Sequence, residues 1–105
     1  MFDDMISTGG TVVQAAELVM EQGANDVIAA ATHAVLAGKA MEKLAASPIS
    51  RIVVTDTIPS GERCDPIADK LTVLSIGELL GNAIQCIHEN KSISALFKRT
   101  AGAKR

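Results

Sequence analysis

The sequence has 105 residues, of which 48% are hydrophobic and only 2% aromatic, and its formal net charge is −2. A core without Trp or Tyr must be built from Ala, Val, Ile and Leu, which is typical of helices packed on a parallel sheet. Four of the ten basic residues lie in the last eight positions, so residues 1–97 carry six bases against twelve acids, a balance that argues against a nucleic-acid-binding surface.

Helical and extended patterns alternate along the chain. A first helix is predicted to end before Gly23, because apolar residues recur at helical spacing: Val12, Ala15, Ala16, Val19 and Met20. A second helix is predicted over residues 37–46, ahead of Pro48. Three short apolar runs predict strands, at residues 26–32, 51–57 and 70–75.

The last predicted helix begins with a capping box of Ser75 and Glu78. Its apolar residues predict one buried stripe: Ile76, Leu79, Leu80, Ala83, Ile84 and Ile87. The order of elements predicts an α/β fold with a parallel sheet flanked by helices. We expect one domain over residues 1–97, truncated at its N-terminus, and a basic tail over residues 98–105.

The loop before the first helix has the composition of a phosphate-binding segment, and we call residues Ser7–Thr11 the cradle. Glycines at 9 and 10 permit a left-handed backbone and let several N–H groups point at one anion. The helix N-terminus adds unpaired donors, and the hydroxyls of the cradle add further ones. It has neither the lysine of a P-loop nor the glycine spacing of a dinucleotide site, which excludes those two classes.

Two carboxylates, Asp3 and Asp4, precede the cradle. They would repel a phosphate but can accept hydrogen bonds from sugar hydroxyls or hold Mg²⁺, so the pattern suits a sugar phosphate. The alternative from spacing alone is a helix capped by Asp next to a glycine turn. Only Met1 and Phe2 stand before the pair, so the strand expected ahead of such a loop is almost absent, which predicts a fragment of a longer protein.

Several motifs together resemble the C-terminal third of the ribose-phosphate pyrophosphokinases, which contain a type I phosphoribosyltransferase-like fold. The acidic pair followed by Thr-Gly-Gly-Thr resembles the phosphoribosyl pyrophosphate motif. The later motifs agree in order and spacing: Ala31-Thr32-His33 with Gly38, residues 54–59, residues 79–84, and residues 92–97. The resemblance covers residues 3–97, nearly the whole chain.

The resemblance implies a ribose-5-phosphate site. By position, Asp3 contacts the ribose hydroxyls, Asp4 is the second acid, and the 5-phosphate is held by the cradle: Ser7, Thr8, Gly9, Gly10 and Thr11. Ser7 stands where many members have an aspartate, so phosphate binding is expected to survive while the ribose contact at that position changes. His33 fits a hydrogen-bonded structural residue and a ligand contact equally well, and we do not name it catalytic. Residues 56–59 are expected either to form part of the rim of the site or to be a turn stiffened by Pro59.

The resemblance also implies a regulatory segment. Ser92, Ile93 and Ser94 resemble the part of the family's allosteric nucleotide and phosphate site that lies across a subunit boundary. The alternative interpretation is a serine-capped helix that packs its apolar residues on the domain, and the two are compatible.

The family transfers a diphosphoryl group from ATP to ribose 5-phosphate with Mg²⁺, through an ATP region and a loop with catalytic Lys and Arg. Neither part is recognisable in this chain, so we expect it to be silent alone and name no catalytic residue and no metal ligand. Two alternatives stay open: a regulatory protein that associates with the synthetase, and a nucleobase phosphoribosyltransferase.

The expected ligand is ribose 5-phosphate or phosphoribosyl pyrophosphate. We also expect a homo-oligomer, because a missing first strand would leave its neighbour's ladder groups unpaired. No signal peptide or membrane-length apolar run is visible, so we expect a cytoplasmic chain without nucleic-acid or membrane partners.

Overall fold

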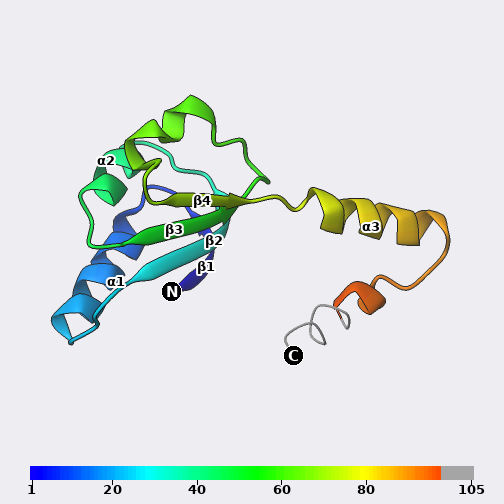
Figure 1. Ribbon diagram of the computed structural model, residues 1–105, viewed down its shortest axis with the longest axis horizontal. Coiled ribbons are helices and arrows are strands. Elements are labelled where there is room, and N and C mark those ends of the chain that lie inside the picture. The colour runs from blue at the N-terminus through cyan, green and yellow to red at the C-terminus, as the bar shows by residue number, and fades with distance from the viewer. Residues whose placement is uncertain (98–105) are drawn as a thin grey trace. The chain divides into compact units, whose positions relative to one another are not determined.

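The computed structural model describes residues 1–97 and contains a four-stranded parallel sheet in the order β1-β2-β3-β4 (Figure 1). The strands are β1 (Phe2–Ile6), β2 (Ile28–Ala34), β3 (Arg51–Thr55) and β4 (Leu71–Leu74). The helices are α1 (Gly10–Glu21), α2 (Ala40–Ala45), the 3₁₀ helix η1 (Gly61–Ile67) and α3 (Gly77–His88). The predicted α/β class, with helices flanking a parallel sheet, is confirmed. The chain divides into two compact units, Met1–Leu74 and the segment from Ser75 onward.

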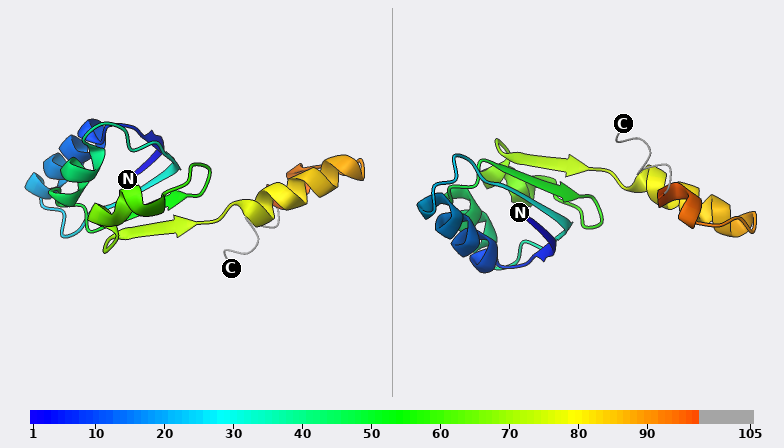
Figure 2. Two further views of the ribbon diagram at one scale, coloured as in Figure 1. Left: turned by 90° about the horizontal axis from the view of Figure 1, so that it is seen from above. Right: turned by 90° about the horizontal axis from the view of Figure 1, so that it is seen from below.

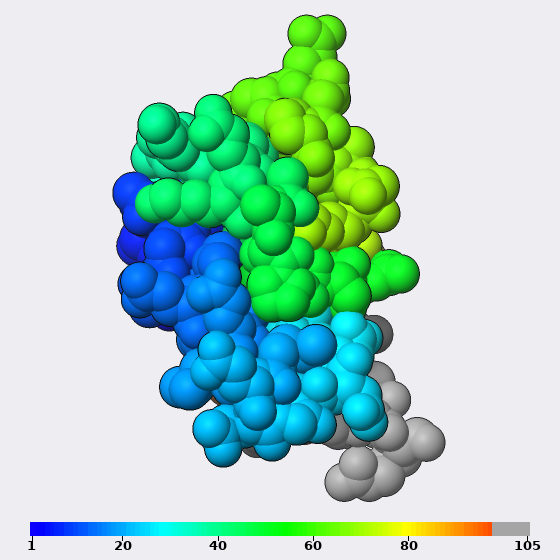
Figure 3. All heavy atoms as spheres, turned by 90° about the vertical axis from the view of Figure 1, so that its left-hand side faces the viewer, coloured from blue at the N-terminus to red at the C-terminus, as the bar shows by residue number. Residues whose placement is uncertain are grey.

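The connections of the first unit all return on the same face of the sheet. Consecutive strands are neighbours, and parallel crossovers are right-handed, so each connecting helix must lie on that one face. Figure 2 shows α1, α2 and η1 on this side, and Figure 3 shows the blue surface of α1 beside the green surface of α2. The alternation of exposure agrees: Ala29 and Ile52 are buried on the helical face, whereas Ile28 is 48% exposed.

The core lies between this face and the helices. Its largest fully buried side chains come from α2, β3, η1 and the loop before β3: Leu44, Ile49, Ile52, Val54 and Ile67. Several alanines complete it, as expected for a chain almost free of aromatic residues. Cys64 in η1 is also buried, although its polar sequence context indicates a loop.

The prediction of an almost absent first strand is wrong. β1 is five residues long and includes both acids, and it pairs in parallel with β2 in a register that joins Phe2 to Ala30 and Ile6 to Ala34. The backbone N–H of Ala30 also donates to the carbonyl of Met1 at 2.8 Å. Pairing with a buried neighbour overrides the low strand propensity of two aspartates. The reason given for self-association therefore falls, while the oligomeric state itself stays a prediction.

The second unit differs from its prediction in two ways. α3 begins at Gly77, and Ser75 accepts a hydrogen bond from the Gly77 N–H at 3.1 Å, so the capping box with Glu78 does not form. Within the described residues of the second unit, 75–97, the stripe on α3 stays uncovered: Leu80 is 51% exposed and Ile84 is 67% exposed. An amphipathic pattern identifies the apolar face of a helix but not whether anything covers it. The tail at residues 98–105 lies outside the described residues, and the predicted domain boundary at 97 stays a prediction.

Candidate sugar-phosphate site

The cradle joins the carboxyl end of β1 to the N-terminus of α1. Gly9 has a φ of 84°, in the left-handed region that favours glycine, and it is buried. Its carbonyl accepts the hydrogen bond of Val13 N at 3.0 Å, which begins the helical ladder. The amides of Gly10, Thr11 and Val12 precede that bond, so they have no carbonyl of an earlier turn to bond. Three N–H groups are thus available to an anion at the positive end of the helix dipole.

A hollow of about 160 Å³ lies at this point. It is lined by residues of β1, the cradle and the first turn of α1: Asp3, Met5, Ile6, Ser7, Thr8, Gly9, Thr11 and Val12. Five of the seven predicted ligand-binding residues are therefore brought together, and Asp4 and Gly10 do not line it. The volume is below the roughly 300–1,000 Å³ of sites for drug-sized ligands, as suits a small ligand. A second hollow of about 150 Å³ adjoins the first and shares Asp3, Ile6, Thr11 and Val12 with it.

The two acids have different surroundings although they are adjacent. Successive side chains of a strand point to opposite faces, and only Asp3 lines the hollow. The Asp4 N–H donates to Asp3 Oδ1 at 2.7 Å. A hydrogen bond with the Asp3 side chain holds the pKa of Asp4 below its usual value, with smaller contributions from backbone N–H groups and from nearby His33. Asp4 therefore keeps its negative charge to lower pH than an ordinary aspartate.

The α2 helix packs directly behind the cradle. A methyl group added at Gly9 would lie 3.7 Å from the Cα and carbonyl oxygen of Ala40 and from Leu44 Cγ. A methyl group added at Gly10 would lie 3.8 Å from Lys43 Nζ. The sequence did not predict a role for Lys43 in the site. The fold nevertheless brings its ammonium group next to the start of α1, where the positive charge favours a bound anion.

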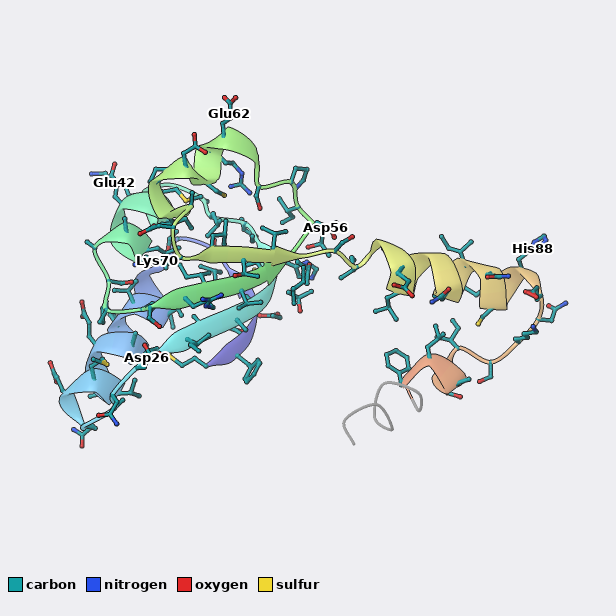
Figure 4. All side chains as sticks on the ribbon, in the orientation of Figure 1. Asp26, Glu42, Asp56, Glu62, Lys70 and His88 are labelled. Carbon is teal, nitrogen blue, oxygen red and sulfur yellow. The ribbon has the colours of Figure 1, made fainter. Side chains whose placement is uncertain are left out.

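His33 and the residues after β3 form a hydrogen-bonded network at the carboxyl edge of the sheet. His33 Nδ1 lies 2.8 Å from Thr57 Oγ1, and Thr55 Oγ1 donates to the Thr32 carbonyl at 2.6 Å. His33 is thus held by a side-chain partner, which fits a hydrogen-bonded structural residue, and its role stays a prediction. Asp56, labelled in Figure 4 at the end of β3, donates its N–H to the Leu74 carbonyl at 3.1 Å. Residues 56–59 do not line either hollow described above.

The predicted allosteric segment lies in the second unit. Ser92 Oγ and Ser94 Oγ are 2.7 Å apart, and the Ser94 N–H donates to Ser92 Oγ at 3.3 Å. The Leu96 N–H then donates to the Ile93 carbonyl at 2.9 Å. These contacts fit the serine cap of the alternative interpretation, the serine-capped helix. The allosteric role stays a prediction.

Arg63 of η1 is a residue that sequence reasoning missed. Its guanidinium donates to backbone carbonyls at the end of β2 and in the turn after β3: Ala34, Val35, Leu36 and Pro59. The surrounding Gly, Pro and Asp residues are typical of loops, so the sequence gives no signal from which a 3₁₀ helix could be predicted.

Comparison with known proteins gives a consistent picture. Residues 1–98 match the family model described as the phosphoribosyl synthetase-associated domain. The ribose-phosphate pyrophosphokinase of Rhodopirellula baltica is 52% identical over 99 residues, which are 93% of this chain and 30% of that protein. The one from Caldanaerobacter subterraneus is 48% identical over 97 residues, which are 92% of this chain and again 30% of that protein.

A solved structure agrees with the sequence relatives. The phosphoribosylpyrophosphate synthetase of Mycobacterium smegmatis superposes with a TM-score of 0.79 at 48% identity, over 85% of this chain and 29% of that one. The chain thus spans about 30% of the length of these relatives. The matches support the predicted family and a resemblance over nearly the whole chain. They do not support the predicted placement in the C-terminal third of these enzymes, and that part of the prediction is given up. The chain belongs to the family of the phosphoribosyl synthetase-associated domain, and it is similar to part of the ribose-phosphate pyrophosphokinases.

Proposed function

We propose that this chain binds ribose 5-phosphate or phosphoribosyl pyrophosphate, as the acceptor part of a ribose-phosphate diphosphokinase. The observation that supports the proposal most is the hollow at the N-terminus of α1, which five of the seven predicted residues line. The relatives that share 44–52% identity with the chain carry the name of that enzyme.

The chemistry of the cradle suits the two ends of a sugar phosphate. The 5-phosphate would accept hydrogen bonds from the amides of Gly10, Thr11 and Val12 and from the hydroxyls of Ser7 and Thr8. The Asp3 carboxylate would accept hydrogen bonds from the ribose hydroxyls. Lys43 would add a positive charge beside the phosphate. The exposed position of the cradle leaves room for the ligand to enter.

In the whole enzyme, the diphosphoryl group of ATP would pass to the anomeric hydroxyl that the cradle presents. Within residues 1–97, no group of three His, Cys, Asp or Glu side chains could hold a metal ion by itself. In the whole enzyme Mg²⁺ would therefore be held largely by substrate phosphates, and it would offset charge on the transferred group. The sequence shows no second phosphate-binding loop, so we expect the chain alone to release no AMP.

A second function is a regulatory one. The description of the matching family, a domain associated with phosphoribosyl synthetase, favours a chain that binds full-length synthetase subunits. Such a chain would keep the cradle and act through assembly. Co-purification with a full-length synthetase, without turnover of its own, would support this function over the first. Part of that association would be with copies of the same chain, as in the homo-oligomer we expect.

Calorimetric titration tests the proposed binding, with ribose and inorganic phosphate as separate ligands to resolve the two ends. We expect ribose 5-phosphate to bind more tightly than either, and Asp3→Asn to weaken ribose 5-phosphate but not phosphate. Asp26→Asn is the matched control, because Asp26 Oδ1 also accepts the N–H of the next residue, at 2.9 Å, but lies before β2 (Figure 4). Equal effects of the two substitutions, or no binding of ribose 5-phosphate, would refute the proposal. An assay of AMP release with ATP, Mg²⁺ and ribose 5-phosphate tests the expected silence.

A further inference from the structure

Arg63 directs one guanidinium at three consecutive carbonyls. Its Nη2 donates to the Ala34 carbonyl at 2.9 Å, and its Nη1 donates to those of Val35 at 3.0 Å and Leu36 at 3.5 Å. Nε and Nη2 also donate to the Pro59 carbonyl, at 3.2 and 3.0 Å. The guanidinium is a planar fork of five donors, so one side chain fixes the segment after β2 and the turn after β3 together.

The N–H groups of the same segment bond the cradle. Leu36 N donates to the Ile6 carbonyl at 3.0 Å, and Ala37 N donates to the Ser7 carbonyl at 2.8 Å. Leu36 has a φ of 51°, a left-handed conformation that is uncommon outside glycine, and its side chain is buried. Such a backbone persists only where the surroundings fix it. Residues 34–37 therefore give carbonyls to Arg63 and amides to the start of the cradle.

We infer that Arg63 is a positioning residue for the ribose-5-phosphate site. The guanidinium fixes the carbonyls of residues 34–36, and this fixes the two amides that hold the carbonyls of Ile6 and Ser7. The middle of the cradle is held through the Gly9 carbonyl, which accepts the hydrogen bond of Val13 N. The inference rests on the proposed function, since the positioned loop is the one proposed to bind the phosphate. Arg63 itself does not line the hollow.

Lys70 provides the comparison for a cation that only stabilises the fold. Its Nζ also approaches three carbonyls, those of Ile49 at 3.1 Å and of Ala45 and Ser47 at 3.5 Å. Lys70 precedes β4, at the amino-terminal edge of the sheet (Figure 4). Arg63 instead bonds carbonyls at the end of β2 and after β3, at the carboxyl edge. Loss of either cation removes bonds of a similar kind, but only the bonds of Arg63 lead to the cradle.

The experiment uses the 105-residue chain with Arg63→Ala, Arg63→Lys and Lys70→Ala. Amide hydrogen exchange at Leu36 and Ala37, calorimetric affinity for ribose 5-phosphate, and urea unfolding are measured on each. We expect Arg63→Ala to speed exchange at both amides and to weaken ribose 5-phosphate roughly tenfold, the effect of about one hydrogen bond. Arg63→Lys is expected to recover part of both losses, since an ammonium lacks the fork. Lys70→Ala is expected to lower resistance to urea without changing either readout.

Unchanged amide exchange and affinity in folded Arg63→Ala would overturn the inference, and so would an equal loss of affinity in Lys70→Ala. If Arg63→Ala does not fold, Arg63→Lys decides the question: wild-type exchange and affinity in that variant would also overturn it. Failure of the wild-type chain to bind ribose 5-phosphate would refute the proposed function instead. In that case faster exchange at Leu36 and Ala37 in Arg63→Ala alone would still support the role of Arg63 in holding the segment.

Discussion

Replacing Gly9 by alanine should reduce stability and ligand affinity for separate reasons. The added methyl group would meet Ala40 and Leu44 at 3.7 Å, an ordinary van der Waals contact, so steric overlap contributes little. The φ of 84° is the larger problem, because an L-residue in the left-handed region costs about 1–2 kcal/mol. For a chain of this size, that corresponds to a melting temperature lower by about 5–15 °C. If the backbone at position 9 changes its φ to relieve this strain, the N–H groups of the next residues, Gly10 to Val12, move as well.

Loss of one amide bond to a charged phosphate oxygen is worth about 1.5–3 kcal/mol, so Gly9→Ala should weaken ribose 5-phosphate roughly ten- to a hundredfold. Gly23→Ala is the matched control: its φ is 102°, it follows the other end of α1, and an added methyl group meets nothing within 4 Å. Thermal unfolding and calorimetry on both variants check the result. If the two variants lose stability and affinity alike, the effect on binding is global and the reasoning about the cradle is refuted.

Three further predictions concern burial, charge and assembly. Leu44→Ala removes a fully buried side chain behind the cradle and should lower the unfolding free energy by about 2–5 kcal/mol in urea. The pKa of Asp4 in the folded chain lies below its usual value of 3.8. The contribution of Asp4 to stability is therefore present above that pH and is lost as the pH falls through the folded pKa. Asp4→Asn should remove this loss of stability in an acid titration followed by circular dichroism. The chain should form a homo-oligomer, and a monomer in light scattering at all accessible concentrations would contradict this.

Much of the first unit could be predicted from its sequence. The runs at β2, β3 and β4 are short and apolar, so their type was clear, and their order with α1 and α2 gave the α/β class. β1 was missed because Asp3 and Asp4 have low strand propensity, and only pairing with β2 makes them part of a strand. η1 was missed because Gly61 and Pro66 are typical of loops.

The site shows the same division between local and long-range information. The glycines and hydroxyls of the cradle are adjacent in sequence, so their chemistry was visible there. Lys43 of α2 lies next to the cradle, and Arg63 of η1 is connected to it only through residues 34–37, so both depend on contacts that only the fold defines. The stripe on α3 was recognised as apolar, but the exposure of Ile84 depends on what covers it and not on periodicity.

The central claim is that the cradle binds the phosphate of ribose 5-phosphate, and amide chemical shifts of the ¹⁵N-labelled chain test it most directly. On titration with ribose 5-phosphate, we predict saturable shifts at residues 8–12 and smaller ones at Asp3, with none of these from ribose alone. Shifts confined to other parts of the chain, or no saturable shift at residues 8–12, would contradict the account.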